Sequence, residues 1–422
     1  MRRRIGQMLP AGLAAIAPCT QAAGSLLLIL VASRTLDLAG LGRLSLLYGF
    51  FVLASGLVSG FVGDSLTVLD RNARPVRGAL QAWFLILAGS VFVLMTVSSH
   101  LVDPSGPAQA LILGSAGFAF VSEEIVRRLL MTDLRFGRVV LVDLAMILGT
   151  GLALLAAAGD GLHLADYVLA ILVGQVTGAL AGVFLLPRSE RYVVTMRGSA
   201  LRQVAGFGVW RAAQQGLRPA VLAGVRFIVI LFVGLAAAGE LEVARVYAAP
   251  ALLLVGGFSS FLFSSYARDP SKPLQELVRR ADRAVVALAV FTLLGSVAAL
   301  LLLPVVGPIV TGLMPDPTAV AGWLCLTLGI GASIPYGSLA AVRGRASTVF
   351  GVRLTESLLS LALAAGVVAL TDSFVLAPMC AACGSLIGAL VLRLVVLTRP
   401  PRTSSPAHSS VAAQSRRSTS HV

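Results

Sequence analysis

Apolar runs of about twenty residues recur along the chain, separated by short segments rich in polar side chains. A run of this length is what an α-helix needs to cross the hydrocarbon core of a bilayer. The pattern predicts an all-α integral membrane protein of about twelve transmembrane helices. The predicted spans are residues 9–32, 44–63, 79–97, 108–126, 139–158, 167–186, 206–238, 243–266, 284–303, 318–342, 349–370 and 374–397.

Basic residues gather in alternate loops between these runs, and in the tail. Those loops contain Arg71, Arg74, Arg77, Arg127, Arg128, Arg135, Arg138, Arg188, Arg191, Arg197, Arg202, Arg268, Lys272, Arg279, Arg280, Arg283, Arg343, Arg345 and Arg353, and the tail adds Arg399, Arg402, Arg416 and Arg417. The other loops lack Lys and Arg, apart from Arg34, Arg43 and Arg245 near the ends of neighbouring spans. Because positive residues favour the cytoplasmic side, the alternation predicts a multi-pass protein of the cytoplasmic membrane with both termini cytoplasmic.

Composition supports the membrane assignment and narrows the chemistry. The 422 residues are 57% hydrophobic and only 12% charged, whereas soluble domains carry about 25% charged residues. The net charge of +14 is explained by cytoplasmic loops, so we expect no nucleic-acid partner. The four cysteines, Cys19, Cys325, Cys380 and Cys383, lie in apolar segments and are interpreted as small buried residues.

The sequence contains no motif that points to catalysis. All four histidines lie in loops or in the tail, away from any cluster with metal-ligand spacing. A phosphate-binding Gly-Lys-Ser/Thr loop and a recognisable nucleophile motif are both missing. We therefore expect neither an enzyme nor a protein with a cofactor or a metal site.

Two halves of the chain have similar layouts. A displacement of 199 residues places Gly40 on Gly239 and Tyr48 on Tyr247, and it superposes the first two spans on the seventh and eighth. The predicted organisation is a six-helix lobe over 1–187, a basic cytoplasmic linker over 188–205, a second six-helix lobe over 206–398, and a disordered cytoplasmic tail over 399–422. Parallel repeats of this kind place a substrate site between the lobes near the bilayer midplane.

The seventh span carries polar residues along one face. At about 100° per residue, Arg211, Gln214, Gln215, Arg218 and Arg226 fall within roughly 120° of one another. An arginine at bilayer depth costs at least about 2.5–3.5 kcal/mol, so the face is expected to line a wet cavity that binds substrate. In the alternative, Arg211 and Arg218 reach the lipid headgroups from an amphipathic entry segment. Pro219 predicts a kink.

Four carboxylates near the cytoplasmic side are candidates for ion coupling. Asp143 and Glu356 lie within apolar runs, and Glu123 and Glu124 close the fourth span four residues before Arg127 and Arg128. The spacing of the last two also fits interfacial ion pairs, and that interpretation is favoured for them. Elsewhere, residues 271–283 predict a short amphipathic helix on the cytoplasmic surface, and residues 305–317, rich in Gly and Pro, predict an outer loop.

Two stretches resemble a known family. They are Ala32-Ser-Arg-Thr-Leu-Asp-Leu-Ala-Gly-Leu-Gly-Arg-Leu-Ser-Leu-Leu-Tyr48, at the junction of the first two spans, and Glu124-Ile-Val-Arg-Arg-Leu-Leu-Met-Thr-Asp-Leu-Arg-Phe, after the fourth. With the six-plus-six layout, they resemble the polysaccharide-flippase branch of the multidrug/oligosaccharidyl-lipid/polysaccharide exporter superfamily, although the family's Pro-Glu pair in the first turn is missing. The resemblance implies two lobes around a central cavity that opens alternately to each face. It also implies a substrate built from a polyprenyl carrier, a pyrophosphate and a glycan.

The expected function is that of a flippase for a lipid-linked oligosaccharide or a related anionic polysaccharide precursor. Arginines suit such a cargo, because guanidinium groups pair with phosphate oxygens. The expected partners are the polyprenyl-pyrophosphate-linked glycan, membrane lipids, and glycosyltransferases or a polymerase of the same pathway. Two alternatives remain: an ion-coupled exporter of small molecules, and a non-transporting membrane scaffold for a glycan-assembly complex.

Overall fold

A computed structural model describes residues 2–102, 106–191, 194, 196, 198–268 and 273–398 of the chain. These residues are overwhelmingly helical, and no strand occurs among them. The tail over 399–422, for which the sequence predicts disorder, lies outside the described residues.

Twelve long helical rods make up the described chain, as the sequence predicts. Their bounds are α1 Arg2–Thr35, α2 Leu38–Val58 with the π-helical turn Ser59–Gly63 and α3 Asp64–Val68, α4 Arg74–Val102, α5 Pro107–Thr132, α6 Phe136–Ala157, α7 Leu164–Leu185, α8 Leu201–Phe232, α9 Leu235–Arg268, α10 Leu274–Thr311, α11 Pro317–Val342, α12 Ala346–Thr371, and α13 Ala377–Val391 with the π-helical turn Leu392–Val396. Short 3₁₀ helices occupy Ala158–Asp160, Arg188–Glu190 and Phe374–Leu376.

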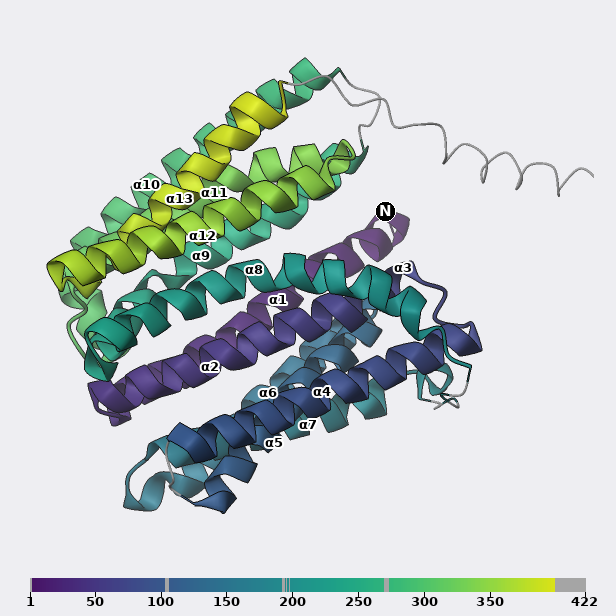
Figure 1. The fold of residues 1–422 in the computed structure, drawn as a ribbon, viewed down its shortest axis with the longest axis horizontal. Helices are drawn as coiled ribbons and strands as arrows, with labels where there is room; N and C mark the ends of the chain where they lie inside the picture. Colours follow the sequence, from purple (N-terminus) through teal and green to yellow (C-terminus); the bar gives the residue numbers. More distant parts are fainter. Residues whose placement is uncertain are drawn as a thin grey trace, which may run out of the picture.

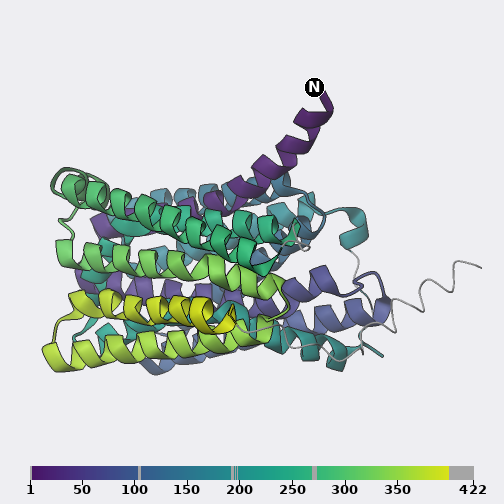
Figure 2. The same ribbon diagram turned by 90° about the horizontal axis from the view of Figure 1, so that it is seen from above.

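Most of these rods can cross a membrane. Of the described helices, 10 are long and apolar enough to do so, and the 19–35 part of α1 is a shorter apolar helix. The rods run side by side along the long axis of the molecule (Figure 2). The chain is a multi-pass membrane protein.

The predicted surface helix over 271–283 is not a separate element. Its described part is the beginning of α10, which runs unbroken from Leu274 to Thr311. Leu277, Val278 and Ala281 are buried against Leu262 and Tyr336 of neighbouring helices. The prediction was wrong because the apolar face packs on protein, not lipid, and nothing between Arg283 and Ala284 breaks the helix.

The predicted outer loop over 305–317 is also shorter than expected. Pro304 and Pro308 lie inside α10, which ends only at Thr311. A proline near a helix C-terminus removes one hydrogen bond without preventing the last turns from forming. Gly312 then ends the helix with a φ of 75°, a left-handed conformation that glycine adopts at little cost.

The rods form two lobes with the same internal arrangement (Figure 1). In the first lobe α6 packs on α7, α5 on α7, α4 on α5 and α1 on α6. In the second lobe the corresponding pairs are α12 on α13, α11 on α13, α10 on α11 and α8 on α12. Each pair recurs six rods later, which is the pattern of a parallel repeat.

Helix α8 connects the two cores and lies between the lobes in Figure 1. Near its start, Val204 is buried with Phe61 and Val76 of the first lobe. Near its end, Val225 and Val229 belong to the main core of the second lobe. The proline predicted to kink it, Pro219, lies inside the continuous helix between these two regions.

Glycines bring the lobes into close contact along α2. A Cβ atom on Gly60 would lie 2.7 Å from the carbonyl oxygen of Arg211, so α2 and α8 approach too closely there for a side chain. At the other end of α2, Gly42 meets the backbone of Leu235, and Gly239 meets that of Leu38. Small residues at these positions allow the tight packing of helices on which lipid-embedded proteins rely.

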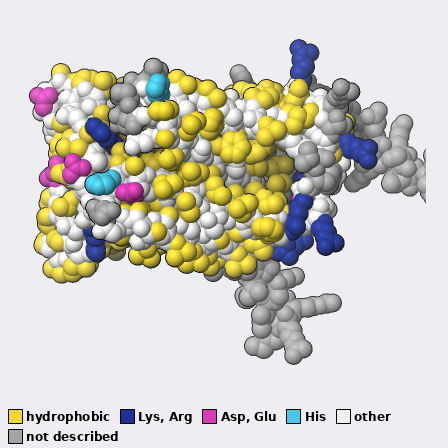
Figure 3. All heavy atoms as spheres, turned by 90° about the horizontal axis from the view of Figure 1, so that it is seen from below, with side chains coloured by type: hydrophobic (Ala, Val, Ile, Leu, Met, Phe, Trp, Pro, Cys, Tyr) yellow, Lys and Arg dark blue, Asp and Glu magenta, His cyan; other side chains and the backbone are white. Residues whose placement is uncertain are grey.

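Charged side chains are concentrated at the two ends of the molecule. Figure 3 shows a broad hydrophobic band with most of the visible Lys and Arg beyond one of its edges. We call this the basic end. It is where α4, α6, α8, α10 and α12 begin. The opposite edge, the far end, carries acidic side chains and histidine (Figure 3).

Candidate functional site

Arg218 stands out on the arginine-bearing face of α8. It lies near the middle of a 32-residue helix, and its side chain is exposed. Of the described residues, none forms a hydrogen bond or ion pair with it. The charged group that acts on it electrostatically is Arg353 of α12. An unpaired guanidinium in an otherwise apolar membrane segment is a group that an anionic ligand can neutralise.

Arg211, two turns earlier, already has partners. It forms an ion pair with Asp64 at 2.6 Å and donates a hydrogen bond to Gln214 at 2.8 Å. Gln215 donates to the same carboxylate at 3.4 Å. Three of the five predicted binding residues therefore meet around Asp64, at the start of α3.

Arg226 is enclosed. Only 6% of its surface is exposed, and it forms an ion pair with Glu242 of α9 at 3.1 Å. Glu242 also pairs with Arg245 at 2.5 Å. We call Arg226, Glu242 and Arg245 the far-end cluster. Arg226 lies against Gly49 of α2, and a Cβ atom on this glycine would lie 3.1 Å from the guanidinium of Arg226.

The carboxylates predicted for ion coupling on α5 and α6 converge on Arg127. Its guanidinium contacts Glu124 at 2.7 Å, Asp143 at 2.7 Å and Glu123 at 3.6 Å. Arg127 is 1% exposed, and Asp143 is fully buried. The pairs Glu123–Arg127 and Glu124–Arg128, inferred from their spacing, both form. Glu123, Glu124 and Arg127 are buried, whereas Arg128 is partly exposed.

This network continues across the lobe boundary. Arg128 contacts Glu124 at 2.9 Å and Asp64 at 3.6 Å, and Asp64 in turn holds Arg211 of α8. We call the seven charged residues the basic-end cluster: Asp64, Glu123, Glu124, Arg127, Arg128, Asp143 and Arg211. Of the ion pairs between described residues, Asp64–Arg211 is the one that joins α8 to the first six rods.

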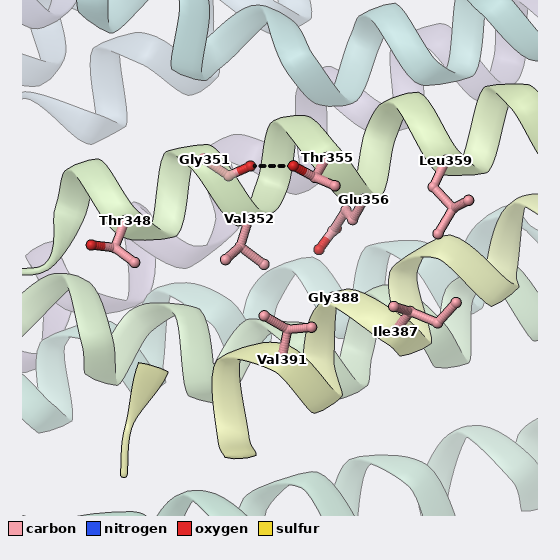
Figure 4. Close-up of a pocket in the computed structure, with 9 residues that line it drawn as sticks. All are labelled: Thr348, Gly351, Val352, Thr355, Glu356, Leu359, Ile387, Gly388 and Val391. Carbon is pink, nitrogen blue, oxygen red and sulfur yellow. Dashed lines mark hydrogen bonds between the residues drawn. The ribbon is translucent and has the colours of Figure 1, made fainter. Parts of the chain in front are cut away.

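Glu356 on α12 lies apart from both clusters. It borders a pocket of about 370 Å³ between α12 and α13, lined mainly by apolar side chains. Figure 4 shows its side chain directed from α12 toward Gly388 of α13. Arg353 donates to its Oε1 atom at 3.3 Å, while its buried Oε2 atom has no hydrogen-bond partner within the described part of the chain. Arg353 is therefore a neighbour of both Glu356 and Arg218.

The sequence analysis did not single out two charged residues of this region, Glu242 and Arg353. Glu242 precedes Arg245 by three residues, a spacing that favours an ion pair on one helix face. That signal was present, but it gives no indication of Arg226, which lies on another helix. Arg353 was counted only as a loop charge, although it precedes Glu356 by three residues on the same helix. Its place near Arg218 depends on the packing of α12 against α8.

Known proteins resemble this chain in structure, whereas the sequence comparisons found no match. No protein-family model matches the chain, and no curated protein matches its sequence. A multidrug resistance MATE family transporter of the MOP superfamily, in its inward-facing conformation, superposes with a TM-score of 0.65 at 14% identity, covering 95% of this chain and 96% of the other. The lipid II flippase MurJ, in an inward closed conformation, gives 0.70 at 12% identity, covering 91% and 87%. The chain has the MOP superfamily fold.

MOP is the multidrug/oligosaccharidyl-lipid/polysaccharide superfamily that the two sequence stretches resemble, so the predicted fold is confirmed. A third MOP superfamily transporter, from Pyrococcus furiosus, superposes with a TM-score of 0.59 at 13% identity, covering 93% of this chain and 97% of the other. It is described as having a binding pocket of reverse polarity that suggests a different function. Within the described ranges of the present MOP fold, no group of three or more His, Cys, Asp or Glu residues could hold a metal ion.

Proposed function

We propose that this protein is an alternating-access flippase of the cytoplasmic membrane. Its cargo would be a lipid-linked oligosaccharide or a related anionic polysaccharide precursor with a polyprenyl pyrophosphate carrier. The fold is shared with transporters that include a lipid II flippase. The observation that carries the proposal is the exposed, unpaired guanidinium of Arg218 in the middle of α8.

Arg218 supports an anionic cargo for reasons of charge and geometry. A guanidinium stays protonated and presents a planar set of donors that fits phosphate oxygens in a bidentate manner. Arg353 adds a second positive charge to its surroundings. Arg353 itself pairs with Glu356, so a pyrophosphate would neutralise the unpaired Arg218, whereas a cationic drug would add a further positive charge beside it.

The remaining predicted binding residues flank Arg218 along α8. Arg211, Gln214 and Gln215 lie on the basic-end side, and Arg226 on the far-end side. In this proposal Arg218 contacts the anionic group first. Arg211 and Arg226, which have carboxylate partners, contribute positive potential on either side of it. Such a row of positive charge would guide an anion along the helix.

We orient the basic end, with both chain termini, toward the cytoplasm. The arginines at the start of α4, α6, α10 and α12 favour this side by the positive-inside rule. The cargo would then enter between the lobes from the cytoplasmic leaflet and leave toward the far end. Glycosyltransferases or a polymerase of the same pathway are the proposed protein partners.

The test is a lipid analysis of cells that lack the gene. We expect one polyprenyl-pyrophosphate-linked glycan to accumulate and a wild-type copy to reverse this. We expect Arg218→Gln to restore transport at least about tenfold less well, because a hydrogen bond to a charged group contributes about 1.5–3 kcal/mol. The matched control is Arg202→Gln, an exposed arginine at the start of the same helix, which should restore transport fully at equal expression.

Two results would contradict the proposal. An unchanged lipid profile in the deletion strain would remove the lipid-linked cargo altogether. Equal restoration by Arg218→Gln and by Arg202→Gln would remove the assigned site. Recovery of partner enzymes in a pull-down, together with no effect of charge changes on α8, would favour the scaffold interpretation.

A second candidate function is ion-coupled export of a small molecule. It is favoured by the similarity to the multidrug resistance MATE family transporter, which spans nearly the whole of both chains. Asp143, Glu356, Glu123 and Glu124 are the coupling candidates in either case. Efflux of a soluble solute that depends on an ion gradient, with an unchanged lipid profile, would select this function over the flippase.

A further inference from the structure

The basic-end cluster contains one carboxylate more than its arginines can balance. Its four acidic members are Asp64, Glu123, Glu124 and Asp143, and its three basic members are Arg127, Arg128 and Arg211. All four acidic residues are at most 7% exposed. An uncompensated buried charge is costly. One carboxylate of the cluster is therefore left without a full counter-charge.

Glu123 is the member with the fewest interactions. It is 3% exposed, and its Oε1 atom has no hydrogen-bond partner among the described residues. The nearest guanidinium nitrogen, Nε of Arg127, is 3.6 Å away. By contrast, Glu124 accepts hydrogen bonds from Arg127 and Arg128 at 2.7 and 2.9 Å. Glu123 is therefore the carboxylate whose charge is least compensated, and the one best placed to take up a proton.

The elements packed around Glu123 supply few other titratable groups. Helix α6 presents Asp143, and α2 presents Tyr48, whose hydroxyl lies within the field of Glu123. Helix α7 contributes Gly178, against which the Glu123 side chain rests. From α1, Thr20 donates to Asp143 at 2.5 Å. Helix α5 itself contributes Glu124, Arg127 and Arg128.

A proton fits this position better than a metal cation. A sodium or calcium ion needs several oxygen ligands around one point. Here the guanidinium of Arg127 occupies the point on which Glu123, Glu124 and Asp143 converge. No described group of His, Cys, Asp or Glu is arranged to hold a metal.

The number of arginines in the basic-end cluster depends on how the two lobes are arranged. Arg211 belongs to α8 and reaches Asp64 only while α8 lies against the start of α3. If the lobes separate at the basic end, the four carboxylates retain only two arginines. The cluster then becomes more negative, and its affinity for a proton rises.

We propose that Glu123 is the proton-binding residue of this transporter, and that breaking the Asp64–Arg211 ion pair at the basic end drives proton uptake by Glu123. The inference rests on the proposed alternating-access function and specifies its coupling ion. By linkage, a proton that binds the open state more tightly favours that state, so a fall in pH opens the basic end. Each tenfold difference in proton affinity between the states allows up to a tenfold change in the ratio of open to closed molecules.

The experiment measures the distance between the lobes at the basic end as a function of pH. Spin labels are placed at Asn72→Cys in the first lobe and Ser347→Cys in the second, two exposed positions at this end. The full-length chain carries serine at Cys19, Cys325, Cys380 and Cys383 and is reconstituted in lipid nanodiscs. Between pH 8.5 and pH 5.5 we expect the population with the longer distance to increase several-fold.

Three variants test the roles of the residues. Glu123→Gln mimics the protonated carboxyl, so the longer distance should dominate at every pH. Arg211→Gln makes the charge of the first lobe independent of lobe position, so the pH dependence should also disappear. The matched control, Glu190→Gln, removes a carboxylate that pairs with Arg71 and Arg77 at the same end outside the cluster, and it should retain the wild-type response.

Two outcomes would overturn the inference: a pH response that survives in Glu123→Gln, and a wild-type distance that is unchanged by pH. Replacement of sodium by choline at constant pH should leave the distances unchanged, and a response to sodium alone would also contradict it. The measurement needs no cargo. A failed lipid analysis would therefore remove the proposed substrate without affecting this result, and a missing pH response would leave the substrate untouched.

Discussion

Two buried ion clusters, one toward each end of the molecule, have opposite charge balances. The basic-end cluster has four carboxylates for three arginines, and Arg127 is its shared partner. The far-end cluster has two arginines for one carboxylate, and Glu242 is its shared partner. The first joins the lobes through Arg211, whereas the second lies within the pair α8 and α9. Only the first therefore changes its charge when the lobes move apart.

The comparison also separates essential from surplus charges. In each cluster one shared residue, Arg127 or Glu242, compensates several charges of the opposite sign. Removing it leaves buried charges unpaired, which is far more costly than the pairs themselves are stabilising. Removing a surplus residue leaves the others satisfied. The stability of a variant should therefore depend mainly on the charge balance that remains in its cluster.

The largest effect is expected for Arg127→Leu. It leaves Glu123, Glu124 and Asp143 without their common cation, and breaking a buried pair typically costs about 3–5 kcal/mol. We expect a strong loss of thermal stability in detergent, or of folded protein in the membrane. The control Arg135→Leu removes an arginine that pairs with Asp133 nearer the surface, and it should cost less than about 1 kcal/mol. Equal stability of the two variants would refute the central role of Arg127.

Glu242→Gln should have the next largest effect, about 3 kcal/mol, because it leaves Arg226 and Arg245 with no counter-charge. It is placed second because one of its arginines, Arg245, is partly exposed and can be hydrated. Glu240→Gln, two residues earlier on α9, is the matched control and should stay within about 0.5 kcal/mol. The measurement is the thermal denaturation midpoint of the purified protein.

Arg226→Gln should cost only about 1 kcal/mol. Glu242 keeps its bonds to Arg245, which contacts it at 2.5 and 2.9 Å. Arg245→Gln should be the more damaging of the two, since it removes more of the bonds to the shared carboxylate. A loss for Arg226→Gln as large as that for Glu242→Gln would break the surplus-charge argument at this end.

The smallest change in stability is expected for Glu123→Gln, within about 0.5 kcal/mol of wild type. The variant removes the surplus carboxylate, whose Oε1 atom accepts no hydrogen bond from any described residue. Glu124→Gln, one residue later, loses charge-assisted bonds to two arginines and should be clearly less stable. If the order of these two variants is reversed, Glu123 is not the surplus carboxylate of the cluster.

The hydrophobic pattern predicted most of the fold. Twelve apolar runs and alternating basic loops correspond to twelve rods with a basic end, because span length and charge placement are set locally by the bilayer. The errors lie at helix ends. The start of α10 was assigned to the membrane surface because the sequence shows its apolar face. The sequence does not show that this face packs against Tyr336 of another helix.

The candidate site was only partly predictable. Periodicity placed Arg211, Arg218 and Arg226 on one face of one helix. Of these three, Arg218 is the one for which the described residues provide no partner. The spacing of Glu123 and Glu124 from their arginines predicted the two local pairs. It did not predict that Asp143 and Asp64 complete the cluster from other rods.

The sequence by itself determined the helices, their number, the charged end and the residues that are costly in a membrane. These depend on neighbours within a few turns along the chain, where helix geometry fixes the distances. Only the tertiary structure decided which costly charges compensate one another. That choice depends on contacts between helices distant in the sequence, such as Asp64 with Arg128 and with Arg211. A pattern along one helix carries no information about which side chain of another helix will face it.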